Sequence, residues 1–484
     1  MKIKKIGLGG SCHWCTEAIF QSIIGVEEVL QGWIAATNEN ESFSEAVIIS
    51  YNENAITLKT LIEIHLHTHS CTSNHSMREK YRSAIYYFNL DQKEEANKAL
   101  SKLQSDFQDK ILTQVIPFKD FKLNKEEQLN YYLKNPEKPF CQSMINPKLK
   151  LIMKTFSKVV NHEKLSHLKE SKIGLGTAAI GRPLYINIKE ENNRKKRGFN
   201  FNNFKDEGLI FLNEAFKAGV THFDSSPGYG IAEEMLIDFS KDKSLNDLSI
   251  STKWGYTYVA NFNEKANTHE IKDHSLEKLN EQWKNSKRLL PFLKTYQIHS
   301  VTTDSDVLAN KDVINRLIEI KNQYNLEIGL STSGEDQIEV IKQAISLNNK
   351  VNSLFSTFQV TFNLLDQSLL TIKDEIKFYN IIIKESLANG RIIASKYDRY
   401  AALQKKLGLL AQKYRVTEDA IAIRYCMDAI NGSIVLIGAD NLKHLNQNLK
   451  ATTFKLTNQE ISELKSFEIS PKDYWEERKK LVWN

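Results

Sequence analysis

The sequence predicts an α/β protein of two domains, a small α+β domain followed by a (β/α)8 barrel, the TIM-barrel architecture. The chain has 484 residues, which is too long for one ordinary hydrophobic core. The residue pattern also changes at a polar stretch near residue 165. Beyond that stretch, strand-like and helix-like segments alternate to the end, which is typical of parallel α/β folds.

The first domain is expected over residues 1–160. A short apolar strand at 3–8 leads into "GGSCHWCTE", which holds Cys12 and Cys15, and a helix-like run follows at 17–24. Residues 161–170 are expected to form a linker, because they are polar and end just before a new apolar strand.

The second domain is expected over residues 171–484. Each of its strand-like segments is followed by an amphipathic segment with apolar residues at helical spacing. Such a series of eight strands closes into a (β/α)8 barrel, whose catalytic groups stand at the carboxyl ends of the strands. The expected strands are 173–177, 221–226, 248–254, 295–300, 326–332, 355–362, 379–386 and 433–439.

Composition excludes several classes of function. The net charge is +6 and the basic runs are short and scattered, so we expect no nucleic-acid partner. The longest apolar stretches are strand-sized, so we expect neither a membrane span nor a signal peptide. Five cysteines do not make a disulfide framework, which favours a cytoplasmic protein.

Four polar residues follow the expected barrel strands in a pattern that suits carbonyl reduction. A carbonyl that accepts hydride becomes negatively charged on oxygen and then takes a proton there. Tyr229 is a suitable acid if the neighbouring Lys253 lowers its pKa. Asp224 would hold that lysine, and His299 would donate a hydrogen bond to the substrate oxygen.

These segments resemble the aldo-keto reductase family across 171–484. The resemblance lies in "FDSSPGYG", "STKWG", "YQIHS", "IGLSTSG", "FQVTFN" and "IGADNLKHLNQN". It implies NADPH or NADH as cofactor and an aldehyde or ketone as substrate. His444 stands where the family's phosphate-binding arginine is usual, so the choice of cofactor stays open. The implied cofactor-binding residues are Gly176, Thr177, Ser331, Thr332, Gln359, Ser386, Gly438, Ala439, His444, Gln447 and Asn448.

The pair Cys12 and Cys15 has three interpretations. A zinc site would need further ligands, and "HLHTHSC" (65–71) would present its histidines on one side if it formed a strand. No second Cys-x-x-Cys completes such a site, so we expect no metal. A thioredoxin-like dithiol fits the spacing, although the rest of the domain lacks that fold's order. In the third interpretation Cys12 is a nucleophile activated by a helix N-terminus.

The third interpretation agrees with a family resemblance. "GSCHWCTE", "SEAVIISYN", "KYRSAIYYF" and "NKEEQLNYYLKNP" resemble the A-type peptide methionine sulfoxide reductases (MsrA) over about residues 4–155. The likeness implies that Cys12 is the nucleophile, assisted by Glu45 and Tyr81. It also implies thioredoxin or a similar dithiol as reductant and no bound cofactor. Cys15 and Cys141 are the candidates for the resolving thiol.

The sequence therefore predicts a fusion of two reductases. One would reduce the S epimer of methionine sulfoxide, and the other would reduce a small carbonyl compound. Two alternatives are a thiol sensor or binding module that regulates the barrel, and a barrel that binds nicotinamide without catalysis. His13 departs from the MsrA pattern, because it replaces the phenylalanine that helps enclose the substrate methyl group.

Overall fold

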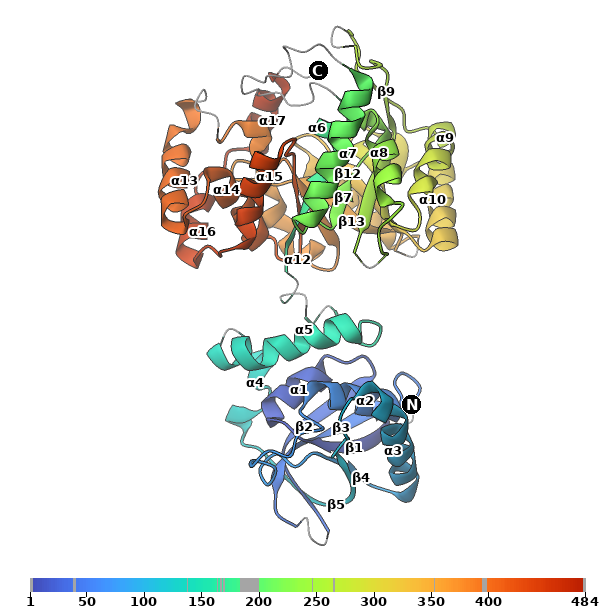
Figure 1. Ribbon diagram of the computed structural model, residues 1–484, viewed down its shortest axis with the longest axis vertical. Coiled ribbons are helices and arrows are strands. Elements are labelled where there is room, and N and C mark those ends of the chain that lie inside the picture. Colours follow the sequence, from blue (N-terminus) through green and yellow to red (C-terminus); the bar gives the residue numbers. More distant parts are fainter. Residues whose placement is uncertain are drawn as a thin grey trace. The chain divides into compact units, whose positions relative to one another are not determined.

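The computed structural model describes residues 3–37, 41–136, 138–162, 164–165, 168, 170–182, 200–245, 247–263, 266–351, 353–393 and 398–481. The chain divides into two compact units, Met1–Leu168 and Lys169–Asn484 (Figure 1). The division falls inside the segment expected to be a linker. Leu165 and Leu168 are buried in the core of the first unit, so that unit includes part of the segment.

The first unit is built on a closed mixed sheet with the strand order β1-β3-β2-β5-β4. β4 and β5 pair in parallel, and the other neighbours are antiparallel. The side chains of β3 are almost all buried, which explains its unbroken apolar run. The strands are β1 (Ile3–Gly9), β2 (Val26–Ala36), β3 (Ser44–Asn52), β4 (Ala84–Tyr87) and β5 (Gln114–Leu123).

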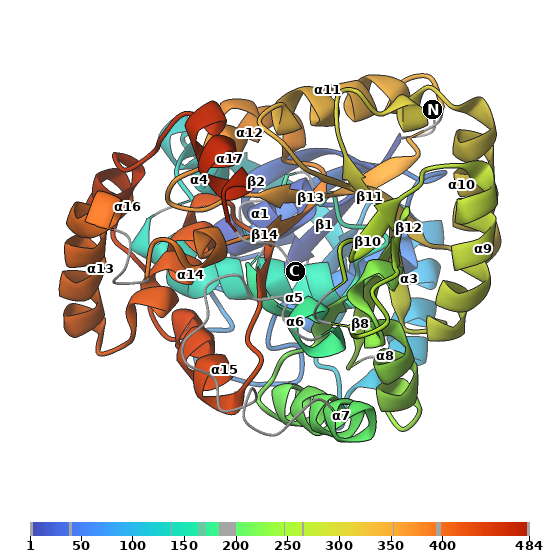
Figure 2. The ribbon, with the colours of Figure 1, turned by 90° about the horizontal axis from the view of Figure 1, so that it is seen from above.

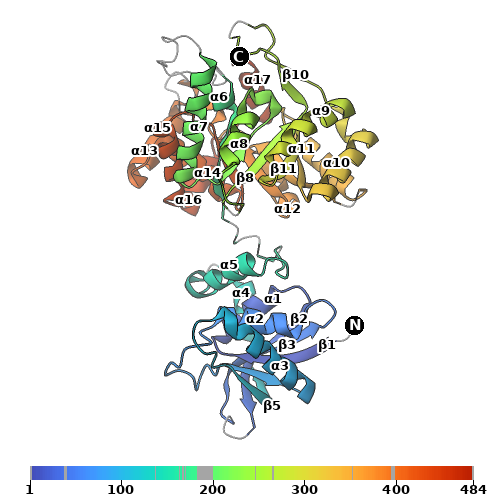
Figure 3. The same cartoon turned by 45° about the vertical axis from the view of Figure 1, so that its right-hand side comes forward.

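Helices pack on this sheet and share the core of the unit with its strands. α2 and α3 lie side by side, and α5 contacts both α1 and α2 (Figure 3). Thr57 caps the start of α2 and Asn89 caps α3, since each side chain accepts a hydrogen bond from the first helical turn. The helices are α1 (His13–Gln21), α2 (Leu58–Thr68), α3 (Leu90–Leu103), α4 (Tyr131–Lys134) and α5 (Asn146–Thr155).

The second unit is a closed barrel of eight parallel strands, which confirms the predicted (β/α)8 fold. Around the barrel the order is β11-β12-β13-β14-β15-β6-β7-β8. Every predicted strand is present, with bounds that differ by a few residues. They are β6 (Lys172–Gly176), β7 (His222–Asp224), β8 (Ser249–Trp254), β11 (Leu293–Val301), β12 (Glu327–Thr332), β13 (Phe355–Thr361), β14 (Asn380–Lys384) and β15 (Ile434–Ile437).

Helices surround these strands, as α8, α9, α10 and α11 show in Figure 2. Among the described residues, no helix has both the length and the apolar character that crossing a membrane requires. The helices are α6 (Ala178–Gly181), α7 (Phe201–Lys217), α8 (Ala232–Ser240), α9 (Leu276–Ser286), α10 (Lys311–Tyr324), α11 (Gln337–Asn348), α12 (Lys373–Ile376), α13 (Ala401–Tyr414), α14 (Glu418–Ala429), α15 (Leu442–Leu449), α16 (Asn458–Lys465) and α17 (Pro471–Lys479).

A short hairpin between β8 and α9 was not predicted. Its strands are β9 (Tyr256–Tyr258) and β10 (Glu270–Lys272), which pair antiparallel. Glu270 forms an ion pair of 2.9 Å with the buried Arg182, which follows α6. The hairpin is thereby tied to the loop that follows the first barrel strand.

Candidate active sites

Cys12 stands at the N-terminus of α1, immediately after the turn that ends β1. Its main-chain oxygen accepts hydrogen bonds from the N–H groups of Cys15 and Thr16, at 3.1 and 3.2 Å. A hydrogen bond from the Cys15 thiol lowers the pKa of Cys12, and the main-chain N–H groups of Trp14 and Cys15 add to this effect. The same contact raises the pKa of Cys15. Of the pair, Cys12 is therefore the thiol that ionises more easily, and Cys15 is the one that stays protonated.

Glu45, on β3, faces this helix start. Its Oε2 atom accepts the main-chain N–H of His13 at 3.0 Å, and its Oε1 atom lies 3.2 Å from the Lys80 ammonium. Lys80 also bonds to the side chain of Tyr81, and both partners raise the pKa of Lys80. The negative charge of Glu45 reaches Cys12 and acts to raise its pKa. The structure thus brings the predicted Cys12 and Glu45 together, and Tyr81 joins them only through Lys80, which sequence reasoning missed.

His13 belongs to a chain of amide and ring contacts behind Glu45. Trp33 donates to Asn124 Oδ1 at 3.2 Å, which fixes the orientation of that amide. The Asn124 Nδ2 atom then donates to Gln31 at 2.7 Å and to His13 Nε2 at 3.1 Å. The Nδ1 atom of His13 lies 3.2 Å from Glu45 Oε2. Burial lowers the pKa of His13, which favours its neutral form.

Aromatic rings form a wall next to the cysteine pair. The ring of Trp14 stacks on Tyr131 with centroids 4.1 Å apart, and Phe140 meets Trp14 edge-on at 5.6 Å. Both oxygens of the buried Glu17 carboxylate accept main-chain N–H groups at the start of α4, which positions Tyr131. The wall gives the thiolate an apolar neighbour that suits a methyl or methylene group.

The other cysteines are buried. Each of the five cysteines is a free thiol. Cys141 is fully buried and close enough to Cys15 to contribute to its raised pKa. Cys71 and Cys426 are also buried, and burial raises the pKa of both.

The histidine-rich segment is not a strand, so the idea of alternating histidines on one side is wrong. Leu58, Leu61 and Ile62 recur at helical spacing, and α2 runs to Thr68. The His65 ring bonds to the Gly9 oxygen at 2.8 Å and therefore faces the core. His67 points in another direction. One of its ring nitrogens and one carboxylate oxygen each of Glu63 and Asp106 all lie within 4.8 Å of one another.

The barrel site lies at the carboxyl ends of β7, β8 and β11. Lys253 donates to Asp224 Oδ2 at 2.5 Å, and its ammonium lies 5.0 Å from the ring centroid of Tyr229. The rings of Tyr229 and His299 meet edge-on at 5.7 Å. The four predicted catalytic residues of the barrel, all positioned by these strand ends, therefore form one cluster.

Asp224 is held from several sides. Ser251 donates to its Oδ1 atom at 2.7 Å and Gln359 to the same atom at 2.8 Å, while Lys253 occupies Oδ2. The Thr177 hydroxyl donates to the main-chain oxygen of Asp224 at 2.9 Å. Ser251 was not predicted; only its position two residues before the lysine on β8 indicates it, since alternate residues of a strand share a face.

The pKa values in this cluster favour neutral tyrosine and neutral histidine. Burial raises the pKa of Tyr229 well above its usual value, and Asp224 and Glu270 add to the rise. The lowering expected from Lys253 is not seen, because Lys253 is not among the main causes that set the pKa of Tyr229. Burial lowers the pKa of His299 well below its usual value, and Lys253 adds to the effect.

The residues implied for the cofactor line the neighbouring strand ends. Ser331 accepts the N–H of Ser300 at 2.8 Å, and the Thr332 hydroxyl bonds to Gln337. A Cβ built on Gly438 would meet no atom within 4 Å, so no described residue fills the space beside this glycine after β15. Amide, hydroxyl and glycine main-chain groups of this kind fit the carboxamide and phosphates of a nicotinamide dinucleotide. The remaining members are Gly176, Thr177, Gln359, Ser386 and Ala439 at the strand ends of β6, β13, β14 and β15.

Three further residues of that set lie on α15. The N–H of His444 bonds to the cap residue Asn441 at 2.9 Å, and its Nδ1 atom lies 2.8 Å from the Asn441 amide. Asn448 is buried and donates to Asp419 on α14. Gln447 is half-buried. The structure thus gives Asn448 a packing role, and it leaves His444 and Gln447 at the helix surface.

Comparison with known proteins agrees with this division. The sequence model of the peptide methionine sulfoxide reductases matches residues 4–160, and that of the aldo/keto reductase family matches residues 172–469. The chain belongs to both families, one in each unit. The predicted resemblances are therefore confirmed.

Individual relatives cover one unit each. Peptide methionine sulfoxide reductase MsrA of Pasteurella multocida is 34% identical over 153 residues, which is 29% of this chain and 88% of the relative. MsrA of Trichodesmium erythraeum is 32% identical over 167 residues, 31% of this chain and 94% of that protein. Among solved structures, a glycerol dehydrogenase from Gluconobacter oxydans is 18% identical, covering 62% of this chain and 91% of its own, with a TM-score of 0.46.

Proposed function

We propose that this chain is a bifunctional oxidoreductase. Its N-terminal unit reduces methionine S-sulfoxide, free or in peptides, with electrons from thioredoxin or a similar dithiol. Its barrel reduces an aldehyde or a ketone with NADPH or NADH. The observation that carries the proposal is that each unit holds a separate cluster suited to one reaction, a cysteine of lowered pKa beside a carboxylate and a tyrosine beside a lysine.

In the N-terminal unit, the Cys12 thiolate attacks the sulfoxide sulfur. The oxygen passes to Cys12, which becomes a sulfenic acid, and the sulfoxide takes two electrons and is released as the thioether. The proton that the oxygen needs comes through Glu45, whose carboxylate lies between Lys80 and His13. The aromatic wall around Trp14 receives the methyl group.

We assign Cys15 as the thiol that resolves the sulfenic acid. Its thiol is the main cause of the lowered pKa of Cys12, which indicates that the two thiols are close, so attack on the sulfenic acid gives a Cys12–Cys15 disulfide with loss of water. An external dithiol then reduces that disulfide and is itself oxidised. Cys141 is near enough to Cys15 to act on its pKa, which keeps it as the second candidate for the resolving thiol.

In the barrel, His299 and Tyr229 act on the carbonyl oxygen. Ser226 accepts the Gly228 N–H and lies 3.0 Å from His299 Nδ1, so its hydroxyl proton can bond to that atom. The second ring nitrogen then carries hydrogen and donates to the substrate oxygen. Tyr229 gives that oxygen its proton, and Lys253, held by Asp224, lies 5.0 Å from the centroid of the tyrosine ring. The bound nicotinamide supplies the hydride.

A paired assay tests both halves on the full chain. Cys12→Ser should abolish dithiol-dependent loss of methionine sulfoxide and spare NADPH-dependent loss of aldehyde; Tyr229→Phe should do the reverse. Cys71→Ser and Tyr324→Phe are matched controls, because both residues lie outside the two clusters. If Cys12→Ser retained sulfoxide reduction, or Tyr229→Phe retained carbonyl reduction, that half of the proposal would be refuted. A cytoplasmic location stays a prediction from cysteine usage.

A further inference from the structure

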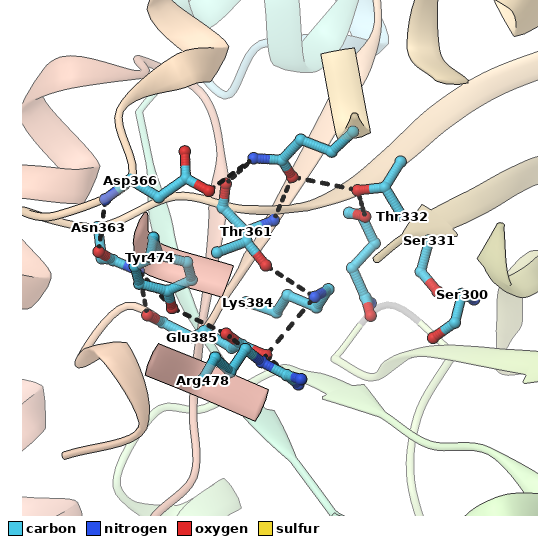
Figure 4. A network of polar contacts seen from close by, with 12 residues as sticks. Ser300, Ser331, Thr332, Thr361, Asn363, Asp366, Lys384, Glu385, Tyr474 and Arg478 are labelled. Carbon is cyan, nitrogen blue, oxygen red and sulfur yellow. Dashed lines mark hydrogen bonds and ion pairs between the residues drawn. The ribbon is translucent and has the colours of Figure 1, made fainter. Parts of the chain in front are cut away.

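Lys384 ends β14 and lies at the same rim of the barrel as the catalytic cluster. It pairs in register with Thr361 on β13, two residues beyond Gln359. Figure 4 shows its side chain between Thr361 and Glu385, with the ammonium end directed to the side on which Ser331 lies. Its side chain is 19% exposed, so the cation is largely removed from water.

The Lys384 ammonium lies over the ring of Trp475, 5.6 Å from its centroid, but it has few hydrogen-bond acceptors in the protein. It donates to the Thr361 hydroxyl at 2.8 Å, and the Glu385 carboxylate lies 3.7 Å away, beyond hydrogen-bond distance. That carboxylate is already occupied, because Arg478 donates to it at 2.6 and 2.8 Å and Tyr474 at 2.9 Å. Among the described residues, the three N–H groups of this ammonium therefore have one hydrogen-bond acceptor.

The charge of Lys384 acts on the catalytic residue His299. It is one of the cations that lower the pKa of His299. Burial lowers the pKa of Lys384 itself to about 8. The charged groups that face it are Glu385 on its own strand end, Arg478 on α17, Asp366 after β13 and Lys253 on β8.

We propose that Lys384 binds a carboxylate or phosphate group on the carbonyl substrate of the barrel. This inference rests on the proposed carbonyl reduction and names its substrate class. An anionic partner strongly stabilises a partly buried ammonium whose N–H donors are not all used. Lys384 acts electrostatically on His299 and lies near Lys253, two of the residues that act on the carbonyl group, so we assign the anion to the substrate rather than to the cofactor.

A matched pair of aldehydes tests the assignment. 4-Carboxybenzaldehyde and methyl 4-formylbenzoate differ in one negative charge. The wild-type chain should show the lower KM for the acid. In Lys384→Met the KM for the acid should rise by about tenfold or more, so that the KM ratio of the pair moves toward one. Lys384→Arg should restore the preference, because it keeps a cation.

Lys377→Met is the control, since it removes an exposed lysine just before the same strand and at its opposite end. A KM ratio that is unchanged in Lys384→Met would overturn the assignment. So would a variant in which only the dissociation constant for NADPH rises, because the anion would then belong to the cofactor.

Direct binding separates this inference from the reaction itself. Terephthalate, which carries the same carboxylate and cannot be reduced, should bind to the NADP⁺-loaded chain in a calorimeter and bind at least about tenfold more weakly to Lys384→Met. If the wild type consumed no aldehyde but bound terephthalate through Lys384, carbonyl reduction would fail and the anion site would stand. If terephthalate bound both chains equally, the anion site would fail.

Discussion

Replacing Cys15 with alanine should weaken the ionisation of Cys12. The Cys15 thiol is the main cause of the lowered pKa of Cys12, and alanine removes that donor without filling its place. A hydrogen bond to a charged group contributes about 1.5–3 kcal/mol, and 1.36 kcal/mol corresponds to a factor of ten. Because Cys12 is not fully buried, water replaces part of the bond. We therefore expect the thiolate to be about tenfold less populated near neutral pH.

The rate of alkylation by iodoacetamide, followed against pH, measures this effect. Thiol nucleophilicity falls as the pKa falls, with a Brønsted coefficient of about 0.4–0.5, so the variant thiolate should be about threefold more reactive once formed. The two profiles should therefore cross. Wild type should react about threefold faster near neutral pH, and Cys15→Ala should react about threefold faster at high pH.

Cys141→Ala is the control, because Cys141 has no part in the lowered pKa of Cys12. The other four cysteines all have raised pKa values, so Cys12 dominates the early reaction. Coincident profiles for wild type and Cys15→Ala would refute the reasoning and leave the helix N-terminus as the activating feature.

Three other changes have definite outcomes. Asp224→Asn leaves the fully buried Lys253 without its counter-charge, so chemical denaturation should show a loss of about 3–5 kcal/mol in barrel stability together with loss of carbonyl reduction. Gly181→Ala places a Cβ 2.2 Å from the main-chain oxygen of Tyr229, so it should abolish aldehyde loss and spare sulfoxide reduction in the paired assay. Since the pKa of Lys384 is about 8, its cation is present below that pH and lost above it; KM for 4-carboxybenzaldehyde should rise above pH 8, and that for the ester should stay level.

The barrel could be predicted because its strands are short apolar runs separated by amphipathic segments. β14 and β15 are buried along most of their length, so composition alone marks them. The hairpin of β9 and β10 has three residues in each strand, and β10 is exposed, which leaves no apolar pattern to detect. The histidines of "HLHTHSC" alternate by chance within a segment whose leucines and isoleucines follow helical spacing.

Catalytic side chains at strand ends were predictable, whereas their neighbours were not. Asp224, Lys253 and His299 follow apolar strands, and the fold brings such positions to one rim. Gln359 lies 135 residues from the carboxylate it binds, and only the closed barrel makes them neighbours. Lys80 is similar, because its contact with Glu45 arises from the pairing of a loop with β3. No local sequence pattern predicts contacts such as those of Gln359 with Asp224 and of Lys80 with Glu45.

The crowding around Asp224 has a consequence for how this barrel can change over generations. The single carboxylate of Asp224 accepts hydrogen bonds from Ser251, Lys253 and Gln359. These three residues can mutate independently of one another. A substitution at any of these positions leaves a buried polar group of the former partner without its hydrogen bond. Substitutions of Asp224 and its three donors should therefore occur together in evolution. A related protein that has lost carbonyl reduction should have replaced all four residues while keeping the barrel strands around them.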